Sequence, residues 1–111
     1  LKEIAVKSTK DIETGWQVAN LPAGFRKVME MSRNLVGRPA PVSHLVYSDG
    51  VSNVSVFVEN SPMPPNTITA VAAEEGPTSF AMRAVNDTQV TVMGEVPLGA
   101  VQAIADGVRR R

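Results

Sequence analysis

Apolar and polar residues alternate along two short runs on either side of Asp49-Gly50, between Pro41 and Glu59. Both runs are rich in β-branched and aromatic residues, and a period of two is typical of strands with one buried face. Asp-Gly strongly favours a tight turn between them, because a type I′ turn needs positive φ at both central residues. The pattern therefore predicts a β-hairpin closed by a two-residue Asp49-Gly50 loop.

The predicted register divides the hairpin into two faces. A two-residue loop places Leu45 opposite Val54, and His44 opposite Ser55. The more apolar face is expected to form the core, and it comprises Leu45, Tyr47, Val54, Val56 and Val58. The opposite face mixes polar and apolar side chains, and it comprises Val42, His44, Val46, Asn53, Ser55 and Phe57. Such a mixed face is either covered by a loop or open to a partner, and the sequence leaves both alternatives open.

Further strands are expected on both sides of this hairpin. They span Trp16–Asn20, Phe25–Asn34, Thr67–Ala73, Ser79–Val85 and Gln89–Val96. The segment Asn60–Asn66 contains three prolines, which keep it out of a sheet, so a surface loop is expected there. For the second hairpin we favour a three-residue loop, Asn86-Asp87-Thr88, over a two-residue loop. The longer loop puts Phe80 and Met82 on the same face as the valines of the following strand.

The period of the pattern changes after Pro97. Apolar residues then recur at spacings of three and four, which places them along one side of a helix, and they are Leu98, Val101, Ile104, Ala105 and Val108. This stripe is expected to pack on the sheet, with a surface helix that binds a partner as the alternative. The chain is thus predicted to be α+β, a curled antiparallel sheet of about six strands packed on a C-terminal helix. Residues 1–15 are expected to form a linker or an edge strand, and residues 16–111 a single domain.

Composition narrows the classes of function. The 111 residues carry 11 basic and 11 acidic side chains, so the net charge is zero, which argues against nucleic acid as a partner. There is no Cys, which excludes disulfides and thiol chemistry. The basic residues Arg109–Arg111 are expected to be a solubilising end or a truncation point, and Trp16 a core residue. The chain opens on Leu1 rather than Met, which predicts a mature form or a fragment.

Candidate catalytic chemistry is sparse. His44 is the single histidine. Its spacing to other residues fixes neither a nucleophile nor an orienting acid beside it, which argues against the hypothesis of a small hydrolase. The carboxylates are scattered, and no glycine-rich phosphate-binding fingerprint is present. No catalytic residue, metal or cofactor is predicted, and the expected function is binding.

Three segments together resemble the C-terminal domain of the RseB/MucB family of periplasmic regulators. They are Trp16–Phe25 (W-Q-V-A-N-L-P-A-G-F), His44–Glu59 (H-L-V-Y-S-D-G-V-S-N-V-S-V-F-V-E) and Val90–Pro97 (V-T-V-M-G-E-V-P). The resemblance implies a periplasmic, non-enzymatic domain that binds the periplasmic segment of a membrane-bound anti-sigma factor. In that family, binding protects the anti-sigma factor from the proteolysis that starts an envelope-stress response. The family also has a larger N-terminal domain, missing from this sequence, and contact with envelope lipid or lipoprotein is expected only through that domain.

The register argument supplies candidate contacts for such a partner. A partner segment would lie on the mixed hairpin face or along a free sheet edge. The candidates on that face are His44, Val46, Asn53 and Phe57. Two alternatives remain: a structural module that forms homo-oligomers, and a domain that binds a small apolar ligand.

Overall fold

The computed structural model describes residues 13–34, 36–37, 40–60 and 69–111 of the chain. The predicted linker or edge strand at residues 1–15 and the predicted proline-rich loop lie largely outside the described residues. The elements are β1 (Trp16–Val18), β2 (Arg26–Arg33), β3 (Val42–Ser48), β4 (Asn53–Asn60), β5 (Ala70–Glu75), β6 (Thr78–Val85), β7 (Thr88–Gly94), α2 (Leu98–Asp106) and β8 (Val108–Arg110). No helix among the described residues is long and apolar enough to cross a membrane.

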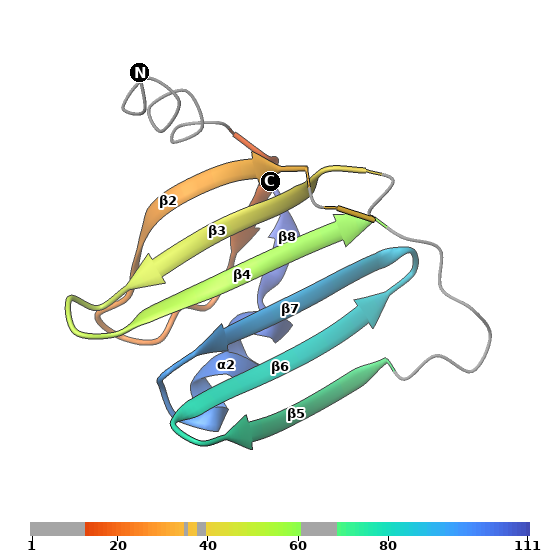
Figure 1. The fold of residues 1–111 in the computed structure, drawn as a ribbon. Coiled ribbons are helices and arrows are strands. Elements are labelled where there is room, and N and C mark those ends of the chain that lie inside the picture. The colour runs from red at the N-terminus through yellow and green to blue at the C-terminus, as the bar shows by residue number, and fades with distance from the viewer. Residues whose placement is uncertain (1–12, 35, 38–39, 61–68) are drawn as a thin grey trace.

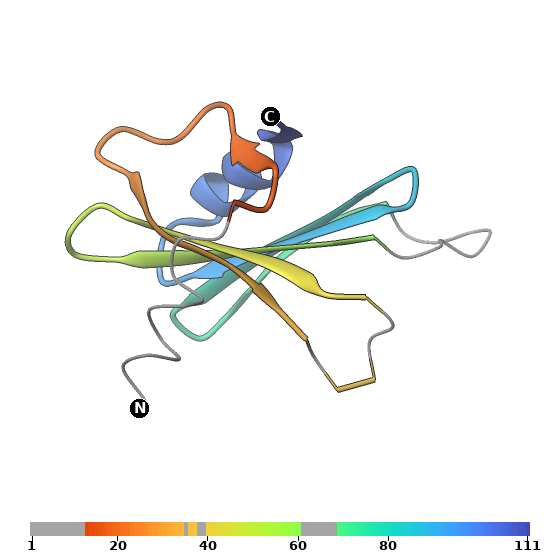
Figure 2. The same ribbon diagram turned by 90° about the horizontal axis from the view of Figure 1, so that it is seen from above.

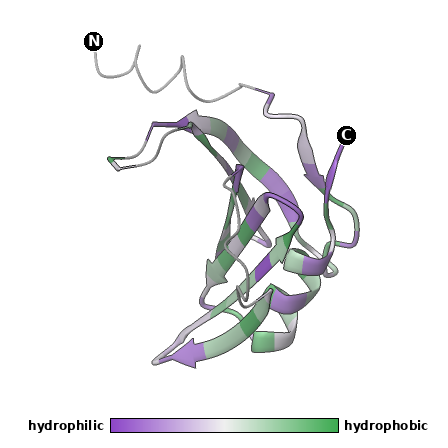
Figure 3. Ribbon diagram, turned by 90° about the vertical axis from the view of Figure 1, so that its right-hand side faces the viewer, coloured by the Kyte–Doolittle hydropathy of each residue, from purple (hydrophilic) through white to green (hydrophobic). Residues whose placement is uncertain are grey.

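Six of the strands form one antiparallel sheet in the order β2-β3-β4-β7-β6-β5 (Figure 1). The remaining two, β1 and β8, pair with each other in a short antiparallel ribbon. Figure 2 shows α2 and this ribbon on the same side of the sheet. The sheet is twisted and curled rather than flat (Figure 3). The predicted α+β architecture, with about six strands on a C-terminal helix, is confirmed.

The hydrophobic core lies between the sheet and α2. The helix buries Val101, Ile104 and Ala105, which belong to the predicted apolar stripe. All five residues of the predicted core face of the first hairpin are buried, and they are Leu45, Tyr47, Val54, Val56 and Val58. Trp16 is also buried in this cluster, as predicted. We call the opposite side of the six-stranded sheet, turned away from α2, the outer face.

The loop of the first hairpin is longer than predicted. Ser48 pairs with Asn53, so the connection has four residues, Asp49 to Ser52. The Asp49 carboxylate accepts hydrogen bonds from the N–H groups of Val51 (2.9 Å) and Ser52 (2.8 Å), which stabilises the wider loop. The register moves by two residues, and because side chains alternate with a period of two, every residue keeps its predicted face.

The loop of the second hairpin is shorter than predicted. Val85 pairs with Thr88, so the loop is the two-residue Asn86-Asp87 and the predicted three-residue loop is wrong. Asn86 adopts a positive φ of 55°, which asparagine tolerates well. In this register Ala81 faces the core, while Phe80 and Met82 lie on the outer face. Ala81 is buried in the core cluster, whereas the larger side chains of Phe80 and Met82 are half-buried on the outer face.

Gly94 allows the two central strands to approach each other. A Cβ atom at this position would lie 2.6 Å from the backbone oxygen of Asn53 and 3.2 Å from the Cα atom of Val54. These are backbone atoms of the paired strand, which cannot give way without disturbing the ladder. The glycine of the V-T-V-M-G-E-V-P segment is therefore required by packing.

The basic C-terminus is part of the fold, so the predicted solubilising end is wrong. Arg109 and Arg110 lie in β8 and pair with β1. The Arg110 guanidinium lies 4.4 Å from the ring centroid of Trp16, a cation–π contact. Arg111 donates hydrogen bonds to the Trp16 carbonyl oxygen (2.7 Å) and to both carboxylate oxygens of Glu30 (2.8 and 2.7 Å).

Candidate functional site: the outer face of the sheet

The four candidate contact residues share the outer face, on the neighbouring strands β3 and β4. Asn53 is exposed, and Val46 and Phe57 are half-buried. His44 lies opposite Phe57 rather than opposite Ser55 as predicted, because the longer first loop shifts the register by two residues. The two rings stack with their centroids 4.3 Å apart and their planes inclined by 15°.

His44 is buried on the outer face, since only 6% of its area is exposed. Its Nδ1 atom accepts a hydrogen bond of 2.9 Å from Nε of Arg33. A guanidinium nitrogen can only donate, so Nδ1 carries no proton and the neutral ring bears its proton on Nε2. Burial lowers the pKa of His44, and the nearby positive charge of Arg33 lowers it further. The ring is therefore a neutral hydrogen-bond donor rather than a charged contact.

The donor of this ring is not used inside the described part of the chain. Nε2 of His44 is buried and has no hydrogen-bond partner among the described residues. A buried polar group without a partner costs free energy, and such groups in native structures call for an explanation. Because this atom is buried, an acceptor from outside would reach it only after a rearrangement of the outer face.

Flexible apolar side chains extend this face across the neighbouring strands. They are Met29 and Met31 on β2, Phe80 and Met82 on β6, Met93 on β7 and Val71 on β5. Met93 is 40% and Val71 41% exposed, whereas the others are half-buried. Methionine side chains adapt their shape to irregular surfaces, which suits a face that meets another polypeptide. The sequence analysis missed this extension because the predicted register placed Phe80 and Met82 on the core side.

A polar hollow of about 420 Å³ lies at one end of the same face. Asn53, Ser55 and Met93 line it together with Val51, whose side chain is 93% exposed at the hairpin tip. The hollow thus brings hydrogen-bonding groups next to the apolar side chains of the outer face, such as Met93 and Phe80. This combination fits an irregular polypeptide segment better than a small rigid ligand.

Neither an acid nor a nucleophile joins His44 to form a catalytic arrangement in the described ranges, since its only hydrogen bond there is to Arg33. Likewise, no group of three or more His, Asp or Glu side chains gathers as a metal site in those ranges.

Glu30 is the most strongly perturbed carboxylate and lies on the opposite side of the sheet, where it is 4% exposed. It accepts hydrogen bonds from Lys27 Nζ (2.5 Å), from Arg111, and from the N–H and hydroxyl of Thr14 (both 2.7 Å). Burial alone would raise the pKa of Glu30, but the hydrogen bonds from Lys27, Thr14 and Arg111 outweigh it and lower the pKa to about 2. Glu30 is a structural anchor, which the sequence pattern does not indicate because two of its partners, Thr14 and Arg111, lie 16 and 81 positions away.

The family model described as the MucB/RseB C-terminal domain matches residues 10–109 of this chain. The chain belongs to the MucB/RseB C-terminal domain family. This confirms the predicted resemblance. Among curated proteins, the chain is similar to the sigma factor AlgU regulatory protein MucB of Pseudomonas aeruginosa, with 31% identity over 107 residues. That alignment covers 93% of this chain and 33% of MucB, so the chain spans about a third of the length of this relative.

Solved structures of MucB contain the same fold as this MucB/RseB C-terminal domain. The complex of Pseudomonas aeruginosa MucA and MucB superposes with a TM-score of 0.76 and 31% identity, covering 90% of this chain and 36% of the matched chain. A second structure, MucB in complex with MucA(peri), gives a TM-score of 0.76 and 32% identity, covering 90% and 38%. A crystal structure of MucB gives 0.60 and 28% identity, covering 87% and 33%.

Proposed function

We propose that this domain binds the periplasmic region of an anti-sigma factor and is a regulatory, non-enzymatic module of the periplasm. The carrying observation is that two solved structures with the same fold are complexes of MucB with MucA. Binding would shield the anti-sigma factor from proteolysis, as the family resemblance implies. The chain spans about a third of the curated relative, so the regulation is proposed for a protein in which this domain makes one of the contacts.

The outer face is the surface that we assign to this contact. Two observations support the assignment: the half-buried apolar side chains around Phe57, and the adjoining polar hollow. In this account Phe57 and Val46 bury apolar side chains of the partner. Asn53 offers its exposed side-chain amide to main-chain groups of the partner, and His44 supports Phe57 through ring stacking.

Substitution of Phe57 by Ala tests the assignment. We expect Phe57→Ala to weaken binding of the periplasmic region of the anti-sigma factor from the same organism by roughly tenfold or more, measured by isothermal titration calorimetry. Phe57→Leu keeps an apolar side chain and should lose less affinity. Val85→Thr, at an exposed position near the end of β6, is the matched control and should bind like the unsubstituted chain.

Cooperative thermal unfolding of each variant separates loss of contact from loss of fold. If Phe57→Ala folds and binds with full affinity, the outer face is not the surface that contacts the anti-sigma factor. Absence of any binding by the unsubstituted chain would overturn the proposed function itself.

A further inference from the structure

Strand β5 forms one edge of the six-stranded sheet, and its main-chain pattern can be derived from one hydrogen bond. The Ala84 N–H donates to the Thr69 carbonyl oxygen at 2.8 Å, so these two residues are a hydrogen-bonded pair. In an antiparallel ladder such pairs alternate with pairs whose N–H and C=O groups point away from each other. The main-chain groups of Ala70, Ala72 and Glu74 therefore point to the open side of β5.

This edge carries few of the features that normally prevent strands from pairing with another chain. Natural edges are blunted by Lys, Pro or bulges, whereas β5 reads Ala-Val-Ala-Ala-Glu-Glu and pairs with β6 without a register shift. Its only charges are Glu74 and Glu75 at one end, both exposed. Neither glutamate forms an ion pair with another described residue.

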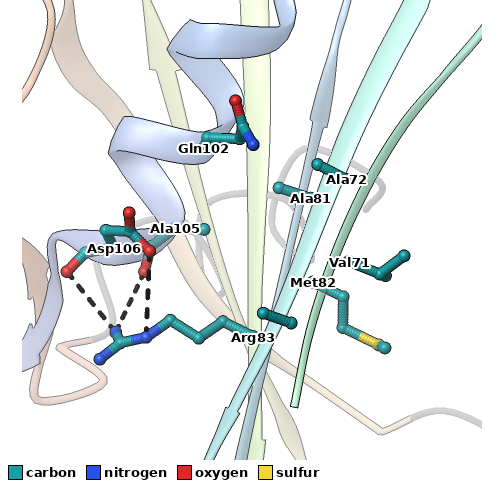
Figure 4. Close-up of a pocket in the computed structure, with 9 residues that line it drawn as sticks. Val71, Ala72, Ala81, Met82, Arg83, Gln102, Ala105 and Asp106 are labelled. Carbon is teal, nitrogen blue, oxygen red and sulfur yellow. Dashed lines mark hydrogen bonds and ion pairs between the residues drawn. The ribbon is translucent and has the colours of Figure 1, made fainter. Parts of the chain in front are cut away.

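A groove of about 270 Å³ runs beside this edge, between β5 and α2 (Figure 4). Ala72, Ala81 and Ala105 line it with small side chains, and Gln102 flanks it from the helix. At its end, Arg83 Nη1 donates to the backbone oxygen of Ala105 at 3.4 Å. A cavity of about 150 Å³ holds a benzene-sized group, so the groove has room for a large apolar side chain.

We propose that β5 accepts an extended segment of a partner protein as an additional strand of the sheet. The outward main-chain groups of Ala72 and Glu74 hydrogen-bond the segment, and one of its apolar side chains enters the groove. The segment carries a basic residue beside Glu74 and Glu75, because two exposed carboxylates at the end of the strand favour a positive charge there. The inference rests on the proposed function in taking the partner to be the periplasmic region of an anti-sigma factor.

A proline at position 72 tests main-chain pairing. Its missing N–H points outward, so Ala72→Pro leaves the ladder to β6 intact, and proline is tolerated at such edge positions. We expect Ala72→Pro to weaken binding of the anti-sigma periplasmic region about tenfold, by titration calorimetry, because one main-chain hydrogen bond is lost and the ring blocks the edge. Ala72→Ser keeps the N–H group and nearly the same volume, so it is the matched control and should bind within about twofold of the unsubstituted chain.

Amide hydrogen exchange on the unsubstituted chain gives a second readout that holds even if Ala72→Pro fails to fold. Binding should slow exchange at Ala72 and Glu74, while Val71 and Ala73 are already protected by β6 and change little. A complex that forms without protection at Ala72 and Glu74, with Ala72→Pro binding normally, overturns the edge proposal and leaves the proposed function standing. Protection that appears with rising protein concentration and no partner identifies a second copy as the occupant, which overturns the assignment to an anti-sigma segment. Absence of binding by the unsubstituted chain overturns both proposals.

Discussion

The two edges of the six-stranded sheet are built in opposite ways. β2 carries Arg26, Lys27 and Arg33 and has a bulge between Lys27 and Met29, and its Glu30 is tied to the C-terminal residue Arg111. β5 has small side chains, regular pairing and an open groove beside it. Charges and bulges prevent edge strands from pairing with other chains. The contrast teaches that one edge is closed by the fold itself, while the other keeps its main-chain groups available.

The largest expected effect comes from opening the closed edge. Glu30→Gln removes the charge that accepts hydrogen bonds from Lys27, Thr14 and Arg111. Glu30 is buried, but the side chains of Lys27 and Arg111 are 41% and 29% exposed, so water compensates these cations once the carboxylate is gone. The lost hydrogen bonds to the Glu30 carboxylate should lower the free energy of unfolding by about 2 kcal/mol. Chemical denaturation measures this. Glu13→Gln removes the carboxylate 3.8 Å from Arg111 that is 85% exposed, and as the matched control it should change stability little.

Glu30→Gln should also change how the stability of the domain depends on pH. The pKa of Glu30 is about 2 in the fold and 4.5 ordinarily, so the unfolded chain takes up this proton first as the pH falls. The stabilisation by Glu30 is fully present above pH 4.5 and is lost as the pH falls toward 2. In Glu30→Gln this loss should be absent from the stability profile. An unchanged acid profile in that variant would show that Glu30 is not the anchor of the β2 edge.

A smaller effect concerns the outer face between the two edges. Burial lowers the pKa of His44 below its ordinary value of 6.5, so the unfolded state binds the proton more readily and stability falls as the pH drops below about 6.5. His44→Gln has no such proton, and its amide oxygen can still accept from Arg33. We expect its unfolding midpoint to be flat between pH 7 and pH 5, where the unsubstituted chain declines. Parallel profiles for the two proteins would contradict the buried neutral state of His44.

The sequence predicts the two faces of the first hairpin correctly, but not those of the second. The first loop was predicted too short, yet every face assignment held, because a shift of two residues preserves the alternation. The second loop was predicted too long by one residue, which reversed the faces. The error came from expecting the larger Phe80 and Met82 side chains in the core, whereas the small Ala81 lies there.

Pattern alone also misses contacts between residues far apart in the chain. Nothing near Arg111 in the sequence indicates that it meets a buried carboxylate on β2, so the basic end was read as solvated. For the candidate site, alternation correctly placed His44, Val46, Asn53 and Phe57 on one face. The burial of His44 and its stacking on Phe57 depend on the true register, which the loop signal did not provide. Their role as partner contacts stays a prediction.

The most direct test of the central claim is a chemical-shift map of the isotope-labelled chain titrated with the periplasmic region of the anti-sigma factor. We expect the shifted amides to gather on the outer face around Phe57 and along β5, with β1 and β8 unchanged. Shifts confined to the β1–β8 ribbon and β2 would contradict the account, because the partner would then occupy the edge that Glu30 and Arg111 close.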